Sequence, residues 1–248
     1  MTKSTSKKLL LPVTALIVAS AALMLLLASG IGRRLDLWHF RTGFTLLKYA
    51  AWLGLASAVI GSVALVLTSL QRLWRAVILS AVAVAIGVTT FAIPWSWKQT
   101  AGRVPKIHDI STDTANPPRF VAIVPLRKDA LNTAEYGGAE IAFKQAQAYP
   151  NLKTLPLPLP PDQAFNLALE TALRMGWRIV AAVPAEGRIE ASDTTFWFGF
   201  IDDIVIRIRP TSNGSLLDIR SVSRVGQSDV GTNAGRIRRF IKNIVDRN

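Results

Sequence analysis

The stretch DIVIRIR, residues 203–209, has the clearest structural pattern in the chain. Its three isoleucines, Ile204, Ile206 and Ile208, alternate with Asp203, Val205 and two arginines. Successive side chains of a strand point to opposite faces of a sheet, so this period of two predicts a β-strand with one buried face.

Three further strands are predicted around this one, at residues 177–183, 188–195 and 215–223. The turns PAEG and PTSNG separate the first and last pairs of strands and have the composition of hairpin turns. A helix is predicted before the strands at 162–175, and another after them at about 230–245. Helices and strands in this order predict an α+β domain, an antiparallel sheet with helices on one face.

The two helices carry apolar residues at helical spacing. Gly176 suits the end of the first helix. In the last helix, Arg236, Arg239 and Asn243 are expected to point away from the apolar stripe. That stripe consists of Val230, Ala234, Ile237, Ile241 and Ile244. Upstream, AEIAFKQAQAYP allows a short helix, and prolines at 156, 158, 160 and 161 favour an extended edge segment.

Three long apolar runs occupy the first part of the chain, at about 9–32, 44–70 and 76–93. Each is long enough to cross the hydrocarbon core of a bilayer as a helix. We therefore expect a membrane anchor at 1–98, an extended connector at 99–118 and a soluble domain at 119–248. For the first run, a cleaved signal peptide is the alternative.

Small residues recur at every fourth position in the second and third runs, which predicts close packing between these helices. The positions are Gly54, Ala58 and Ser62, followed by Ala81, Ala85 and Thr89.

The formal net charge of +13 is unevenly distributed. Residues 1–98 have a net charge of +9, which flanks the apolar runs, and residues 207–248 have a net charge of +6, whereas residues 99–206 have −2. The aromatic residues are not interleaved with the basic ones as stacking platforms for nucleic acid require. The lipid bilayer is therefore the expected partner, and nucleic acid is not.

Three spans place the amino terminus and the soluble domain on opposite sides of a membrane. The lysine-led first run resembles an export signal, which favours an amino terminus inside the cell. The count of basic residues at the helix ends slightly favours the reverse orientation. We expect a multi-pass protein of the bacterial inner (plasma) membrane with a periplasmic domain.

Three motifs resemble the signatures of the DUF1499 family of unknown function. They are IHDISTDTANPPRF from Ile107, FGFIDDIVIRI from Phe198 and DIRSVSRVGQSDVGTNAGRIRRF from Asp218, and the resemblance covers roughly residues 105–245. Members of this family often carry an export signal or a lipoprotein anchor, which would agree with an envelope location. The resemblance implies no catalytic residues, because the family has no established activity.

No familiar catalytic motif is present in the sequence. Cysteine is absent, and we find no nucleophile elbow, phosphate-binding loop or zinc-ligand spacing. No catalytic residue and no cofactor is predicted. Asp202, Asp203 and Asp218 are the candidates for a divalent cation site. Adjacent residues of a strand point to opposite faces, so Asp202 and Asp203 cannot both face one site.

Five residues near the carboxyl terminus are candidates for binding an anion: Arg220, Arg224, Ser228, Asp229 and Arg236. Free N–H groups at the start of the last helix, with an arginine nearby, can hold a phosphate, a carboxylate or a lipid head group. Alternatively, Ser228 or Asp229 caps the helix, and the arginines are solvated or pair with Asp202, Asp203 and Asp218.

The sequence favours a membrane-anchored, non-enzymatic binding or assembly module with an anionic lipid or an envelope protein as its partner. One alternative is a metal-assisted hydrolase, in which Asp202 or Asp203 acts with Asp218 while Arg220 and Arg224 steer an anionic substrate. Another alternative is a lipid-tail cavity between the sheet and the last helix.

Overall fold

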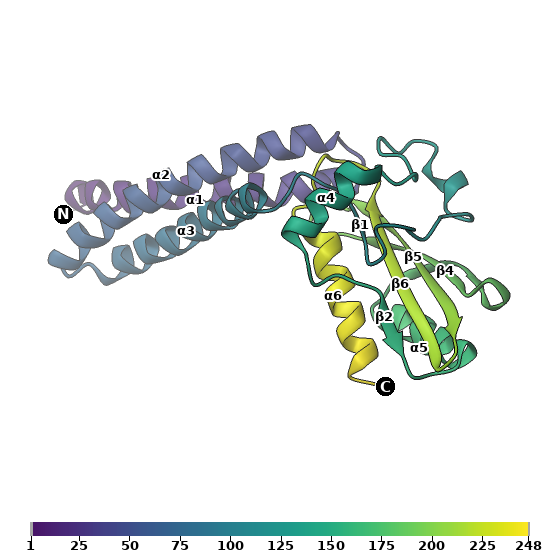
Figure 1. Cartoon of the computed structure of the whole chain (residues 1–248). Helices are drawn as coiled ribbons and strands as arrows, with labels where there is room; N and C mark the ends of the chain where they lie inside the picture. The colour runs from purple at the N-terminus through teal and green to yellow at the C-terminus, as the bar shows by residue number, and fades with distance from the viewer. Residues whose placement is uncertain (1, 248) are drawn as a thin grey trace. The chain divides into compact units, whose positions relative to one another are not determined.

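The computed structural model describes the backbone of residues 2–247 and the side chains of residues 8–247 (Figure 1). The chain forms two compact units. The helical unit runs up to Gln99 and also includes Trp197–Gly199, and the α+β unit comprises Thr100–Phe196 and the residues from Phe200 onward.

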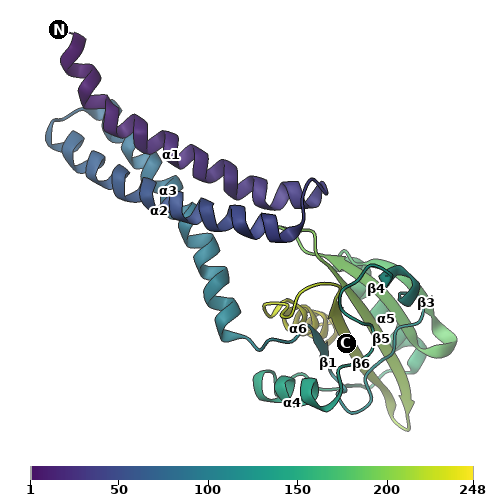
Figure 2. The same ribbon diagram turned by 90° about the horizontal axis from the view of Figure 1, so that it is seen from above.

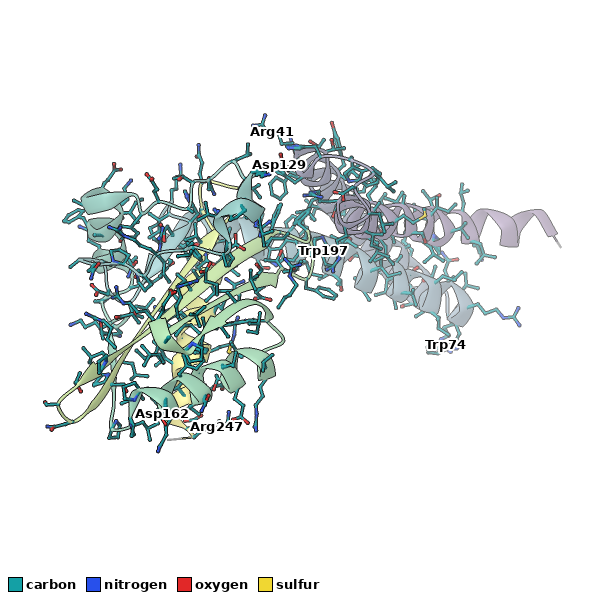
Figure 3. All side chains as sticks on the ribbon, turned by 90° about the vertical axis from the view of Figure 1, so that its right-hand side faces the viewer. Arg41, Trp74, Asp129, Asp162, Trp197 and Arg247 are labelled. Carbon is teal, nitrogen blue, oxygen red and sulfur yellow. The ribbon has the colours of Figure 1, made fainter. Side chains whose placement is uncertain are left out.

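Three long helices form the helical unit: α1 (Thr2–Arg34), α2 (Phe40–Leu70) and α3 (Trp74–Arg103). All three are long and apolar enough to cross a membrane, which confirms the prediction of three long apolar helices in the first part of the chain. They run side by side in both ribbon views (Figures 1 and 2). Arg41 near the start of α2 and Trp74 at the start of α3 mark opposite ends of this bundle (Figure 3).

Small residues let these helices approach each other closely. The Ser57 hydroxyl donates to the carbonyl of Ala15 at 2.9 Å and lies 3.3 Å from that of Ala83, so α2 contacts both α1 and α3. A methyl group added at Gly54 would lie 2.8 Å from the carbonyl oxygen of Gly87, which leaves no room for a larger residue.

The line of small residues differs from the predicted one. Gly54 is buried as expected, but Ser62 and Ala85 are exposed. The buried positions follow alternating steps of three and four residues, because steps of four alone drift around a helix with 3.6 residues per turn. They are Gly43, Ala50, Gly54, Ser57, Gly61, Ala64 and Thr68 in α2, and Ala76, Ser80, Ala83, Gly87 and Thr90 in α3.

Residues Trp197–Gly199 also belong to the helical unit. The Trp197 indole donates to the Ser29 hydroxyl at 3.2 Å. The Phe198 ring lies edge-on to Phe44, with ring centroids 4.9 Å apart.

The α+β unit is built on a six-stranded sheet that is antiparallel throughout, as predicted. Its strands are β1 (Asp109–Ser111), β2 (Leu155–Leu157), β3 (Arg178–Val183), β4 (Arg188–Thr194), β5 (Ile201–Thr211) and β6 (Gly214–Ser223). The order is β1-β6-β5-β4-β3, and β2 pairs with another part of the same edge of β6.

One side of this sheet, here called the helix face, packs against α5 (Pro161–Arg174) and α6 (Thr232–Val245). Ile204, Ile206 and Ile208 of β5 belong to this core, as their alternation predicts. Trp177 stacks on Phe240 with ring centroids 5.3 Å apart, so large side chains occupy the space where a lipid-tail cavity was considered. α5 begins and α6 ends at the same end of the sheet, as Asp162 and Arg247 indicate (Figure 3).

The other side of the sheet, here called the charged face, is covered by the segment 112–137. This segment contains the short 3₁₀ helix η1 (Val124–Arg127) and crosses the sheet on the side opposite α5 and α6 (Figure 2). A small apolar cluster holds it down, formed by Phe120, Ile123, Val205 and Val222. α4 (Gly138–Ala148) follows and confirms the short helix predicted in this region.

Some boundaries differ from the expectations. Within the expected connector, α3 continues to Arg103 and Asp109–Ser111 pairs with β6, so part of the segment 99–118 is regular structure. The proline-rich segment contains β2, an edge strand as predicted. The turn PAEG forms η2 (Pro184–Glu186), followed by Gly187 at φ 60°, where glycine is favoured.

Candidate functional site

The charged face holds a layer of buried polar side chains, because every second residue of each strand points to this side. β5 and β6 pair Asp203 with Val222 and Arg207 with Asp218, which places the four side chains on one face. The layer contains Asp109, Glu190, Ser192, Asp203, Asp218 and Arg220, and each is 5% exposed or less. Buried charges persist only where they are paired and hydrogen-bonded.

Asp203 on β5 is shared by two arginines. One carboxylate oxygen accepts from Arg127 at 2.5 Å, and both oxygens accept from Arg224 at 2.9 Å. The Ser192 hydroxyl donates to the same carboxylate at 2.7 Å. Two guanidinium groups on one carboxylate leave a local excess of one positive charge.

Arg220 on β6 forms a bidentate ion pair with Asp109 on β1, with N–O distances of 2.9 and 2.7 Å. It also donates to the main-chain carbonyls of Pro118 and Ala134, at 3.2 and 2.8 Å. Burial raises the pKa of Asp109, and its ion pair with Arg220 opposes that rise. Arg220 therefore ties two parts of the covering segment to the sheet.

Two aromatic rings enclose the Arg220 guanidinium. Its central carbon lies 5.2 Å from the ring centroid of Phe120 and 5.4 Å from that of Tyr136. A guanidinium over an aromatic face is attracted by the ring quadrupole. Burial raises the pKa of Tyr136 to about 12, with a further rise from Asp109 and an opposing effect from Arg220. The phenol therefore remains a neutral hydrogen-bond donor at physiological pH.

A second arginine cluster surrounds Asp218, further along the same face. Arg207 and Arg209 both donate to one carboxylate oxygen, at 2.8 and 2.9 Å, and the Thr154 hydroxyl donates to the other at 2.6 Å. Asp113 accepts from Arg207 at 3.0 Å. The carboxylate of Asp218 is thus fully occupied by side chains of the protein.

Glu190 on β4 fastens the covering segment through its main chain. Its carboxylate accepts from the N–H groups of Val121, Ala122 and Ile123, at 3.0, 3.0 and 2.8 Å, and forms an ion pair with Arg188. Hydrogen bonds from N–H groups to an ionised carboxylate are charge-assisted and therefore strong. The start of η1 is therefore held against the sheet.

Arg236 on α6 lies on the opposite side of the sheet and is only 1% exposed. It donates to Asp193 at 2.8 Å, to Asp202 at 2.7 Å and to the side chains of Ser221 and Asn233. The prediction that Arg236 points away from the apolar stripe is wrong, because acidic residues of the helix face draw it inward. Burial disfavours the charged form, but Asp202 and Asp193 outweigh it and raise the pKa of Arg236.

The start of α6 is satisfied by residues of the chain itself. The Asp229 carboxylate accepts from the N–H of Gly231 at 3.0 Å and from that of Asn233 at 2.6 Å. The Ser228 hydroxyl accepts from the N–H of Val230 at 3.1 Å. Burial raises the pKa of Asp229, while its N–H donors oppose this rise. Val230, expected in the apolar stripe, precedes the helix and is 38% exposed, and Phe240 is buried instead.

The structure does not gather the five anion-site candidates in one place. Arg220 and Arg224 act on the charged face, Arg236 belongs to the helix face, and Ser228 and Asp229 precede α6. Among these three arginines, Arg224 has the most exposed side chain, at 17%, and the side chains of Arg220 and Arg236 are buried.

The three carboxylates considered for a cation are also separated. Asp202 pairs with Arg236 on the helix face, whereas Asp203 and Asp218 are on the charged face. The register sets Asp203 and Asp218 four residue positions apart along the paired strands, about 13 Å at the usual rise per residue. Among the described residues, no group of three or more His, Asp or Glu side chains could hold a metal ion.

A pocket of about 770 Å³ opens between the covering segment and β6, and we call it the face pocket. Its polar and aromatic lining includes Arg119, Phe120, Arg127, Asn132, Tyr136 and Arg220. Within residues 8–247, two residues of this lining each have a buried polar atom without a hydrogen-bond partner, Arg127 Nε and the Tyr136 hydroxyl, and neither atom is accessible from the pocket. Burial lowers the pKa of Arg127, and Asp203 opposes the change.

Sequence reasoning did not assign a role to Asp109, Phe120, Arg127 or Tyr136. Asp109 and Phe120 lie within the motif IHDISTDTANPPRF, which was a usable signal. Arg127 and Tyr136 lie outside the three motifs, in a segment without periodicity.

The fold and this layer of paired charges define a class: an α+β domain that follows three helices able to cross a membrane. Residues 109–244 match a family model described as "Protein of unknown function (DUF1499)". The match covers more than half of the chain, and the protein belongs to the DUF1499 family. The three long helices lie outside the matched region, and no curated protein matches the chain.

Proposed function

We propose that this protein is a membrane-anchored envelope protein whose α+β domain serves as a binding or assembly module for an anionic partner. The observation that carries the proposal is the shared carboxylate of Asp203, since Arg127 and Arg224 leave an excess positive charge there. Such an excess attracts anions. An anionic lipid or an acidic surface of an envelope protein is the partner that this charge favours.

The carboxylates of the domain support binding rather than catalysis. A general acid, a general base or a metal ligand needs a carboxylate free to reach substrate or ion. Asp203 and Asp218 are each saturated by arginine and hydroxyl donors, and Asp202 is paired on the other face. A hydrolase that uses these aspartates is therefore the less favoured alternative.

For the location, we propose the bacterial inner membrane with the α+β domain on the periplasmic side. The lysine-led first helix supports this orientation, because it resembles an export signal. Protease added to spheroplasts should remove a carboxyl-terminal tag while a cytoplasmic control protein remains intact. A tag that is digested only after lysis would refute this orientation.

The binding function is tested on the full chain, purified in mild detergent. Native mass spectrometry should detect a retained lipid or protein, and Arg224→Gln should reduce that retention, while Asp203 keeps its ion pair with Arg127 in the variant. Arg224 is chosen because its side chain reaches solvent. Steady hydrolysis of phosphoesters or glycans with added divalent metal, abolished by Asp218→Asn, would instead support the hydrolase.

A further inference from the structure

We infer that the β4–β5 loop, residues 195–200, is a membrane-contacting element that lies where the hydrocarbon core of a bilayer meets the lipid head groups. Its partner is the phospholipid of the bilayer that α1, α2 and α3 would cross. This inference rests on the proposed function and deepens it, because it names phospholipid as a partner and this loop as a place of contact.

The loop is seated on the long helices. The Trp197 indole donates to the Ser29 hydroxyl of α1 at 3.2 Å, and its ring lies edge-on to Trp97 of α3, with ring centroids 5.6 Å apart. The Phe198 ring packs edge-on against Phe44 of α2, with centroids 4.9 Å apart. Side chains of the loop therefore contact all three helices that could cross a membrane.

A glycine of α1 makes room for this contact. A methyl group added at Gly30 would lie 2.6 Å from the carbonyl oxygen of Trp197, and the three atoms nearest to it all belong to Trp197. At Gly43 of α2, an added methyl group would lie 3.0 Å from the Phe198 ring. The helix surfaces are therefore shaped to receive the loop.

The contacts of the loop also fix its level along the helices. Ser29 precedes Arg33 by four residues, about 6 Å along α1, and Phe44 follows Arg41 by three residues, about 4.5 Å along α2. Basic residues that flank an apolar helix mark the boundary between hydrocarbon and head groups. The loop thus lies within about one helical turn of that boundary.

The aromatic side chains of the loop suit this level. Phe196 is 84% exposed, which makes it the most exposed large apolar side chain among residues 8–247. Water solvates such a ring poorly, whereas lipid acyl chains remove its apolar surface from water. The neighbouring Trp197 has the amphipathic ring that is enriched at both interfaces of a membrane.

Exposed cations next to the loop suit the phosphates of lipid head groups. Arg34, Arg41 and Lys98 are all exposed, and a methyl group added at Gly199 would lie 3.2 Å from the Arg34 side chain. Arginine and lysine near a membrane surface attract anionic head groups. An acidic protein surface would match these cations but not the exposed Phe196 ring. A phospholipid matches both.

The test measures the depth of the loop in the full chain, reconstituted into phospholipid nanodiscs. The chain has no cysteine, so one introduced cysteine carries the only spin label. Phe196→Cys is compared with Val59→Cys, on the exposed side of α2, and with Asp162→Cys, at the exposed start of α5. Collision rates with oxygen, which concentrates in lipid, and with a water-soluble nickel complex report the surroundings of each label.

The ratio of oxygen to nickel collisions at position 196 should be several-fold higher than at position 162 and somewhat lower than at position 59. A ratio at position 196 equal to that at position 162 would overturn the inference, because the loop would then face water. Shielding of the label from both reagents would also overturn it, because protein would then cover the loop.

Gly30→Val tests the seat on α1 in the background of the label at position 196. The larger side chain displaces Trp197, so the ratio of oxygen to nickel collisions should fall toward the value for water. Gly102→Val is the matched control, since a methyl group added at Gly102 of α3 would have no atom within 4 Å. Equal ratios in the two variants would overturn the role of α1 in holding the loop.

A lipid-soluble carbene precursor gives a second measurement on the unmodified chain. After photolysis in nanodiscs, peptide mass spectrometry should find the label at Phe196 but not at Phe143. Phe143 is the matched aromatic control, because it is 64% exposed on α4. Equal labelling of the two rings, or none at Phe196, would contradict the inference.

The two levels of proposal can fail separately. If the chain retains a partner after purification but the label at position 196 faces water, only the inference about the loop is wrong. If the label at position 59 also behaves like the one at position 162, the helices do not cross the bilayer. The proposed membrane anchor would then be wrong as well.

Discussion

The two faces of the sheet are packed through different kinds of interaction. The helix face is mainly an apolar core of isoleucine, leucine and aromatic side chains packed against α5 and α6, with one buried ion-pair cluster around Arg236. The charged face joins an irregular segment to the sheet through buried ion pairs, with Arg127 on Asp203 and Arg220 on Asp109. Apolar packing tolerates changes of shape if volume is conserved, whereas a buried ion pair loses most of its value when either partner is removed.

The largest effect is expected from Asp203→Asn on the charged face. The change keeps the side-chain shape but leaves the buried Arg127 and the partly buried Arg224 with an uncharged partner, which should lower the free energy of unfolding by about 3–5 kcal/mol. Pulse proteolysis of the full chain in urea measures this energy. Asp162→Asn is the control, since Asp162 is exposed at the start of α5 (Figure 3), and it should change stability by less than about 0.5 kcal/mol. If Asp203→Asn lowered the free energy of unfolding by less than about 1 kcal/mol, the charged face would be no more sensitive to substitution than the helix face.

A smaller effect is expected from Ile206→Val on the helix face. Ile206 is fully buried in the core, and removing one methylene should cost about 1 kcal/mol. The same urea titration reports it. A cost as large as that of Asp203→Asn would mean that the helix face is equally intolerant.

The smallest effect concerns pH and the start of α6. Burial raises the pKa of Asp229 in the folded protein above its value in the unfolded chain. The folded state then binds this proton more tightly, so the carboxyl group favours folding below its unfolded pKa and loses that contribution as pH rises through its folded pKa. Asp229→Asn removes the titration while keeping an acceptor for the helix N–H groups.

The measurement for Asp229 is the free energy of unfolding at several pH values from about 3 to 7, with wild type and variant side by side. The stability of the wild type relative to Asp229→Asn should fall as pH rises. A relative stability that rises with pH would show that the hydrogen bonds from Gly231 and Asn233 outweigh burial.

The helix face was largely predictable from sequence, because its elements carry local periodicity. The alternation in DIVIRIR identified β5 and the side of it that is buried, and the 3.6-residue spacing identified α5 and α6. The strand β1 was missed, because three residues are too few to show a period. The prediction for Arg236 was wrong, because helical spacing alone does not show that Asp193 and Asp202 lie on the facing side of the sheet.

The charged face was only partly predictable. The family motifs point to Asp109, Asp203 and Arg220, but the partners lie far apart in sequence: Arg220 is 111 residues from Asp109, and Arg127 is 76 residues from Asp203. Such pairings leave no local pattern in a single sequence. One alternative was that the arginines pair with Asp202, Asp203 and Asp218, without specific partners, and the structure pairs Arg224 with Asp203 and Arg236 with Asp202.

Glu190 has a consequence for which substitutions the covering segment tolerates. Its carboxylate accepts hydrogen bonds from main-chain N–H groups, which every residue except proline has. The path of the covering segment at Val121 therefore does not depend on which side chain is present there, and the Val121 side chain is 57% exposed. Substitutions at that position, other than to proline, can therefore alter the outer surface of the segment without changing its path across the sheet.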